Sequence, residues 1–235
     1  MAMVAGEPGI GKTRTAQELA VYAEERGAQV LWGRCYEEEG SPSYWPWIQP
    51  LQAYVRRSSA EQLIAEMGSG ASHVSEIVYE VGNKLPDLKP PPALEPEAAR
   101  FWLFDSISTF LKNAAQSQPM LLVLDDLHWA DKSSLLLLQF LALEIATSHL
   151  LVVGTYRDVE LSRQHPLSET LVELSRSSAT GGFRRILLRG LDLENTALLI
   201  EASAEVETTT ELVEALHVHT EGNPFFMTEA IRLLS

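Results

Sequence analysis

The chain has 235 residues, a length that suits one α/β domain or one such domain with a small helical appendage. Its 32 acidic and 18 basic residues give a formal net charge of −14, which argues against broad binding to a nucleic-acid backbone. The single cysteine, Cys35, excludes an internal disulfide and suits a reducing compartment. The sequence has neither an apolar run of about 18 to 20 residues nor a secretory signal pattern. We therefore expect a cytoplasmic protein without a membrane span.

The first part of the chain predicts a strand, a glycine-rich loop, a helix and a second strand. Residues 1–5 read as the end of a short strand. Residues 13–26 predict a helix, because small apolar residues recur along one face. Gly27 ends this helix and residues 29–32 predict the second strand.

The loop at residues 6–13 reads Gly-Glu-Pro-Gly-Ile-Gly-Lys-Thr and matches the whole Walker A motif. The motif requires a strand before it and a helix after it, and both are predicted here. Such a loop cradles phosphates with backbone N–H groups. Lys12 reaches the β and γ oxygens, and the Thr13 hydroxyl is available to Mg²⁺. The other reading, an ordinary glycine-rich turn before a helix, leaves this context unexplained.

The next part of the chain predicts mainly helices around a proline-rich loop. Helical patterns cover residues 44–57, 60–67 and 73–83, and the loop covers residues 85–96. Residues 97–116 predict a long amphipathic helix. Its expected core-facing residues are Phe101, Phe104, Ile107 and Leu111.

The second half of the chain alternates apolar strands with helices. Predicted strands cover residues 119–124, 150–155 and 183–188, and predicted helices cover residues 131–146, 166–175 and most of 192–235. Near-continuous apolar strands indicate a parallel sheet that is covered on both faces. We therefore predict an α/β fold of the P-loop NTPase type, with ligands at the carboxyl ends of the strands.

The strand at residues 119–124 runs into the paired carboxylates Asp125 and Asp126, the form of a Walker B motif. We assign Asp125 to Mg²⁺ and Asp126 to the attacking water, although these two roles could be exchanged. Arg157 also follows a buried strand and could reach a γ-phosphate. Its alternative is a surface arginine paired with Asp158 or Glu160.

Two further polar residues lie close behind the Walker B pair. His128 could contact phosphate or water, but membership of the local hydrogen-bond network explains it more simply. Asp131 fits the N-cap of the following helix. His217 and His219 face apart on a helical pattern, so we do not expect them to form a metal site.

Four segments in this order resemble the ATPase module of the signal-transduction ATPases with numerous domains (STAND), a branch of the AAA-type P-loop proteins. They are residues 6–14, 125–131, 154–157 and 222–226. The subgroup that they resemble occurs in large LuxR-type transcription regulators and in multidomain cyclases and kinases. The resemblance covers essentially the whole chain.

This resemblance implies a five-stranded parallel sheet with a central P-loop strand, sandwiched by helices and followed by a helical lid. Residues 1–190 would form the ATPase core, and residues 191–235 a truncated lid. Arg157 would be the sensor arginine, and Pro224 the lid proline near adenine. ATP or ADP with Mg²⁺ would be the cofactors. The implied nucleotide-binding residues are Gly6, Glu7, Pro8, Gly9, Ile10, Gly11, Lys12, Thr13, Arg14 and Pro224.

The expected function is that of a slow ATP-hydrolysing switch in a bacterial signalling or transcription regulator. Its partners would be nucleotide and other domains or copies of the regulator, without direct nucleic-acid or membrane binding. The alternatives are a nucleotide-binding scaffold that does not hydrolyse ATP, an origin-recognition-type AAA ATPase acting with nucleic acid, and a small-molecule kinase. The net charge of −14 disfavours the second, and the Walker B pair with a long lid fits the third poorly.

Overall fold

The computed structural model describes residues 1–37, 42–162, 164–176, 182–203 and 209–234. Its strands are β1 Ala2–Gly6, β2 Gln29–Arg34, β3 Met120–Asp125, β4 Leu150–Arg157 and β5 Arg184–Leu187. The longer helices are α1 Lys12–Glu25, α2 Trp45–Arg57, α3 Ala60–Met67, α6 Pro96–Ser117, α7 Lys132–Glu144, α8 Pro166–Arg176, α9 Leu193–Ser203, α10 Thr210–Thr220 and α11 Pro224–Leu234. Short helices are α4 Ala71–Ser75, α5 Glu80–Lys84 and the 3₁₀ turns Gly68–Gly70 and Leu127–Trp129.

The strands form one five-stranded sheet in the order β2-β3-β4-β1-β5, and every pairing is parallel. This confirms the α/β fold class and the parallel sheet. The expectation that the P-loop strand is central was wrong, because β1 lies between β4 and the edge strand β5, and β4 takes the middle position. All six residues of β3 are buried, and the five before Asp125 form an unbroken apolar run that is typical of a strand covered on both faces.

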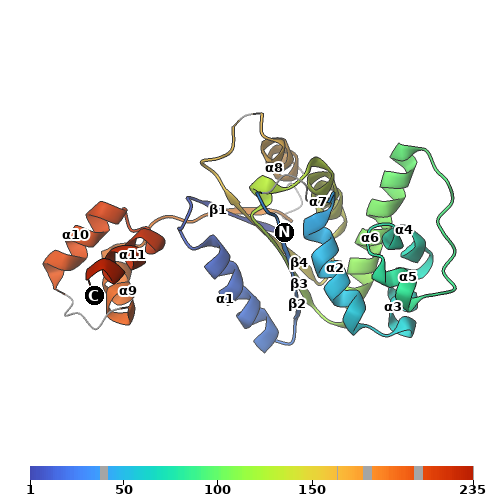
Figure 1. Cartoon of the computed structure of the whole chain (residues 1–235), viewed down its shortest axis with the longest axis horizontal. Helices are drawn as coiled ribbons and strands as arrows, with labels where there is room; N and C mark the ends of the chain where they lie inside the picture. Colours follow the sequence, from blue (N-terminus) through green and yellow to red (C-terminus); the bar gives the residue numbers. More distant parts are fainter. Residues whose placement is uncertain (38–41, 163, 177–181, 204–208, 235) are drawn as a thin grey trace.

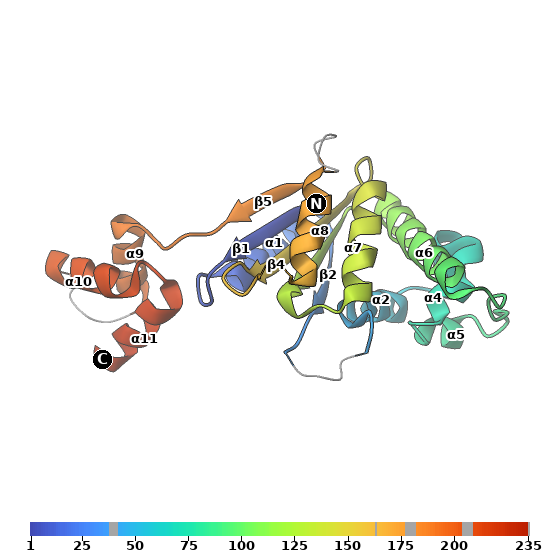
Figure 2. The same cartoon turned by 90° about the horizontal axis from the view of Figure 1, so that it is seen from above.

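Helices cover both faces of the sheet unequally (Figure 1). One face packs against α1 through Val4, Leu121, Val123 and Val153. The other face belongs to a larger core that also contains buried residues of α2, α6, α7 and α8. The view from above shows α7 and α8 over this face, and α4 and α5 beyond α6 (Figure 2).

The first turn of α2 packs directly on the end of β2. A Cβ at Gly33 would lie 1.8 Å from the carbonyl oxygen of Pro46, so only glycine fits there. Pro50 lies inside α2 and has no N–H, so this carbonyl oxygen has no helical i+4 partner. Gln49 completes the contact, since its Nε2 donates to the carbonyl oxygen of Arg34 at 2.8 Å. This packing sets the position of the carboxyl end of β2.

Two predictions for the helical region need correction. The predicted helix at residues 73–83 is broken, because residues 76–79 form turns between α4 and α5. Valine, isoleucine and glycine favour helix weakly, and the turns let Val74, Val78 and Val81 all become fully buried. Phe101 was expected in the core but is 52% exposed, and its ring packs edge-on against Phe140 at the rim of α6 and α7.

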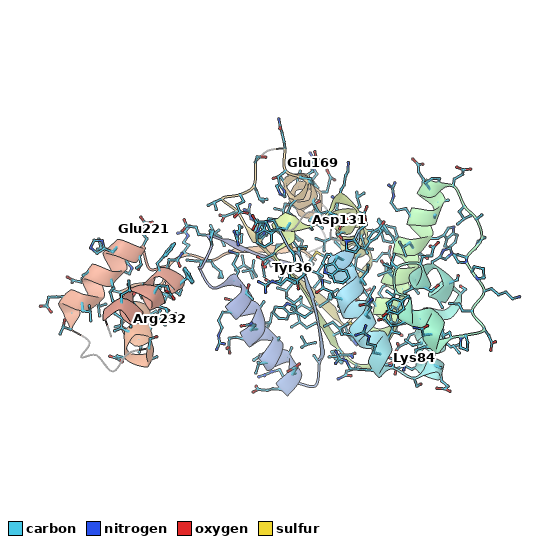
Figure 3. The ribbon with its side chains drawn as sticks, viewed as in Figure 1. Tyr36, Lys84, Asp131, Glu169, Glu221 and Arg232 are labelled. Carbon is cyan, nitrogen blue, oxygen red and sulfur yellow. The ribbon has the colours of Figure 1, made fainter. Side chains whose placement is uncertain are left out.

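The last three helices form a separate hydrophobic cluster from α9, α10 and α11, whose buried members are Ile200, Val213, Leu216, Met227 and Ile231. We call this cluster the lid. Both views place it beside the loop that joins β1 to α1 (Figures 1 and 2). Glu221 and Arg232 lie in the lid, whereas Asp131 and Glu169 lie on the sheet-containing part (Figure 3). Among the described residues, no helix combines the length and apolarity that a bilayer crossing requires.

Candidate functional site

The carboxyl ends of four neighbouring strands meet at one edge of the sheet. In the parallel register, Gly6 of β1 lies opposite Arg157 of β4, and Arg34 of β2 lies opposite Asp125 of β3. The Walker A and Walker B segments are 112 residues apart in sequence at Thr13 and Asp125, yet their side chains touch. The register therefore brings the Walker A loop, the Walker B pair and Arg157 to one edge of the sheet.

The Walker A loop has the backbone of a phosphate cradle. Gly6, Gly9 and Gly11 have φ values of 151°, 79° and 102°, in the region that favours glycine. A Cβ at Gly6 would also lie 2.9 Å from Cγ2 of Ile10. Ile10 is buried, so its side chain holds the loop against the protein interior. The loop is thus held in a tight turn that substituted residues would strain.

Helix α1 begins directly after this loop and points its N-terminus at it. Within the described chain, the N-cap Gly11 makes no side-chain capping bond and the first turn contains no acidic residue. The first N–H groups of a helix lack internal partners and attract anions. Arg14 lies away from this point, since it is exposed and pairs with Glu18 on the outer surface of α1.

Lys12 is buried, and its amine folds back over the loop. Its Nζ donates to the carbonyl oxygens of Gly6 at 2.9 Å and Glu7 at 2.7 Å. Burial lowers the pKa of Lys12 and the nearby charge of Arg157 lowers it further, while the carboxylates of Asp126, Asp158 and Asp125 oppose the shift. The amine therefore lies within the electrostatic reach of both Arg157 and the Walker B pair.

Asp125 is fully buried between two hydroxyl groups. Thr13 Oγ1 donates to its carboxylate at 3.1 Å, and Thr155 Oγ1 donates to Oδ1 at 2.6 Å. Thr155 also accepts a bond from the Asp126 N–H at 2.9 Å. Sequence reasoning missed Thr155, although its segment was singled out, because its contact depends on the register of β3 against β4.

Asp126 differs from Asp125 in backbone and in partner. Its φ of 61° is left-handed, so its side chain leaves the strand in a different direction. Arg34 Nη2 donates to Asp126 Oδ2 at 3.3 Å, and Arg34 Nε lies 3.7 Å from Asp125 Oδ2. Arg34 is a second residue that the sequence did not reveal as part of the site. Its position as a polar residue at the carboxyl end of a strand, β2, is the sequence feature that could have identified it.

Arg157 lies at the end of β4, next to the Walker A loop in the sheet. Its Nη1 donates to Glu160 Oε1 at 2.7 Å, and its guanidinium lies 4.8 Å from the ring centroid of Trp129. The sequence offered Asp158 and Glu160 as partners of Arg157, and the structure shows the bond to Glu160. At 29% side-chain exposure, Arg157 is more covered than an ordinary surface arginine.

His128 lies beneath this arginine and is almost fully buried. Burial lowers its pKa to about 4, an effect that Glu160 opposes and that Arg157 and Lys12 strengthen. Among the described residues neither ring nitrogen has a hydrogen-bond partner, and Nε2 lies 3.5 Å from Glu160 Oε2. Asp131 is the N-cap of α7, as expected, since its carboxylate accepts from the Ser134 N–H at 3.1 Å.

The lid touches the Walker A loop from the other side. Asn223 Nδ2 donates to the carbonyl oxygen of Pro8 at 3.0 Å, and Asn223 Oδ1 accepts from the Phe225 N–H. A Cβ at Gly9 would lie 2.7 Å from Cβ of Phe225. Pro224 begins α11 between these two residues, which places it at the lid face near the loop. Asn223 was missed because its role depends on how the lid packs.

These residues suit a nucleotide with Mg²⁺. The glycine conformations and the uncapped helix N-terminus suit phosphate, and buried carboxylate and hydroxyl oxygens suit a hard cation. Thr13 and Asp125 would hold Mg²⁺, which neutralises phosphate charge when bound. Asp126 can orient a water, and Lys12 can meet phosphate oxygens. Within the described part of the chain, no three His, Cys, Asp or Glu residues gather into another metal cluster.

Comparisons with known proteins bear on the family and on the fold. A family model described as the AAA ATPase domain matches residues 1–153. The fold is also similar to that of a Signal Transduction ATPase with Numerous Domains (STAND) protein with a tetratricopeptide repeat sensor from Pyrococcus horikoshii. That likeness has 16% sequence identity and a TM-score of 0.52, and it covers 95% of this chain but 26% of that one. A search of curated proteins gave no match.

Proposed function

We propose, from the premise that the chain belongs to the family of AAA ATPase domains, that it binds ATP and hydrolyses it slowly as the switch module of a bacterial signalling or transcription regulator. The observation that carries the proposal is the contact of Thr13 with Asp125 at 3.1 Å. This contact brings a Walker A hydroxyl and a Walker B carboxylate to one point, as the joint handling of phosphate and Mg²⁺ requires.

Each predicted residue has a role in this proposal. Residues 6–13 contact the phosphates through the loop, with Lys12 on the β and γ oxygens. Arg14 would contribute only its backbone N–H, since its side chain pairs with Glu18. Thr13 and Asp125 hold Mg²⁺, and Asp126 orients the attacking water. Arg157 contacts the γ-phosphate, since it ends β4 opposite Gly6. Pro224 lies near adenine, which its place at the start of α11 supports.

The switch would work through the difference between ATP and ADP at the γ-phosphate. Arg157 and Lys12 contact the γ-phosphate only in the ATP-bound form. The bound nucleotide therefore shifts the equilibrium between two arrangements of the module. Residues 191–235 would act as the lid that responds. The contact of Asn223 with Pro8 supports this role, because it joins the lid to the phosphate loop.

The partners that we propose are other domains or copies of a larger regulator, in the cytoplasm. The chain spans about a quarter of the length of the STAND protein that it resembles, which is described as having a tetratricopeptide repeat sensor. The net charge of −14 supports the absence of direct nucleic-acid binding by this chain. We propose no membrane role.

A nucleotide-binding scaffold without turnover is the second candidate. The contact of Arg34 with Asp126 favours it, because a carboxylate that is held by a guanidinium is less free to orient water. The two candidates differ in phosphate release and agree in nucleotide binding.

The replacement Asp126→Asn separates them. We expect Mg-ATP affinity to stay within about threefold, and phosphate release to fall by about a hundredfold because the water loses its carboxylate partner. The exposed Asp87→Asn is the matched control and should release phosphate at the wild-type rate. Equal release by Asp126→Asn and the wild type would show that another group orients the water. No release by the wild-type chain, with normal ATP binding, would favour the scaffold.

A further inference from the structure

Glu160 places a carboxylate against two groups of the candidate site. Its Oε1 accepts from Arg157 Nη1 at 2.7 Å, and its Oε2 lies 3.5 Å from Nε2 of the buried His128. The sequence motifs do not include Glu160, and the proposed chemistry does not use it. One of its oxygens nevertheless binds the arginine that would recognise a γ-phosphate.

This ion pair is less exposed than three arginine–glutamate pairs that each lie within a single helix. The pairs Arg14–Glu18, Arg176–Glu173 and Arg232–Glu229 have both side chains half exposed or more. Arg157 and Glu160 are 29% and 39% exposed. An ion pair with less solvent around it is screened less and contributes more.

Arg157 is also held in place from a second direction. Its guanidinium lies 4.8 Å from the Trp129 ring centroid, a cation–π contact. The charge of Arg157 reaches Lys12, whose pKa it helps to lower. Arg157 therefore stays near the phosphate loop while its Nη1 donates to Glu160.

Carboxylate and phosphate oxygens compete for a guanidinium, because both accept its paired N–H groups. A diphosphate lacks the group for which Arg157 is placed, so the competition concerns the triphosphate alone. On the basis of the proposed function, we propose that Glu160 is an internal competitor of the γ-phosphate for Arg157. Glu160 thereby determines how strongly the site prefers ADP over ATP.

The test is the replacement Glu160→Gln, which keeps the size of the side chain and removes its charge. ATP and ADP affinities are measured by titration calorimetry with Mg²⁺ on the full chain. We expect ATP affinity to rise by about threefold, the scale of a partly exposed ion pair, and ADP affinity to stay unchanged. The control is Glu173→Gln, which removes the charge from a 2.7 Å pair with Arg176 on α8, and it should change neither affinity.

A double-mutant cycle with Arg157→Gln separates direct competition from a general loss of negative charge. In the Arg157→Gln background, the change Glu160→Gln should no longer alter ATP affinity. An unchanged ratio of ATP to ADP affinity in Glu160→Gln would overturn the competitor role, and so would equal tightening of both nucleotides. If the wild-type chain bound neither nucleotide, the proposed function itself would fail, and the role of Glu160 with it.

Discussion

Neighbouring side chains in this site lie in different surroundings, which gives them different chemistry. Asp125 is enclosed by two threonine hydroxyls, whereas Asp126 leaves the strand with a left-handed backbone and meets Arg34. This difference supports the assignment of Asp125 to the metal and Asp126 to water. The exchange of these roles, which the sequence left open, is what the Asp126→Asn experiment tests.

The buried His128 predicts a pH dependence of stability at the residue scale. Burial lowers its pKa in the folded chain from 6.5 to about 4. Between pH 6.5 and pH 4, His128 is therefore protonated in the unfolded chain but stays neutral in the folded chain. Because the unfolded state binds the extra proton, lowering the pH favours unfolding. Between pH 7 and pH 5, His128 should lower the free energy of unfolding by about 2 kcal/mol. Urea denaturation at both pH values measures it.

The variants for this experiment are His128→Asn and the exposed His219→Asn. The free energy of unfolding of His128→Asn should depend less steeply on pH than that of the wild type, while His219→Asn should keep the wild-type slope. Identical slopes for all three proteins would mean that His128 is not held neutral in the fold.

At the scale of elements, the join between β2 and α2 fixes the end of the strand that carries Arg34. The replacement Gly33→Ala would set a Cβ 1.8 Å from a backbone oxygen that cannot move without shifting α2. We expect a loss of about 3 kcal/mol in the free energy of unfolding. Gly82→Ala in α5 is the control, since no atom lies within 4 Å of its added Cβ, and it should be neutral or slightly stabilising. A wild-type denaturation midpoint for Gly33→Ala would contradict this packing.

The sequence predicts most elements because local pattern determines them. Apolar runs mark the strands, and residue spacing identifies the Walker A loop. Pattern fails where distant packing decides. Phe101 repeats the apolar period of α6 but lies beyond the part of the helix that is covered. Arg34, Thr155 and Asn223 join the site only through strand register or lid packing, which no local window contains.

At the scale of the whole molecule, the lid is a separate cluster that contacts the core at the phosphate loop. The hydrogen bond from Asn223 to Pro8 joins the two parts. Asn223→Ala removes this bond and the cap on Phe225, so we expect the lid to sample more positions relative to the core. Spin labels at positions 169 and 221, in a Cys35→Ala background, would report a broader distance distribution.

The control for this measurement is Asn195→Ala, which alters a lid side chain that donates to Asp192 at 2.9 Å. It should keep the narrow distribution of the parent protein. If Asn223→Ala also kept that distribution, the lid would be held by contacts other than Asn223.

The central claim is that the loop at residues 6–13 binds the phosphates of ATP. Calorimetric titration of Mg-ATP into the wild type, Lys12→Ala and the exposed Lys132→Ala tests it most directly. Loss of a charged hydrogen-bond donor to phosphate should weaken ATP binding by about tenfold or more in Lys12→Ala. Lys132→Ala should bind as the wild type does. Equal ATP affinity of Lys12→Ala and the wild type would contradict the account.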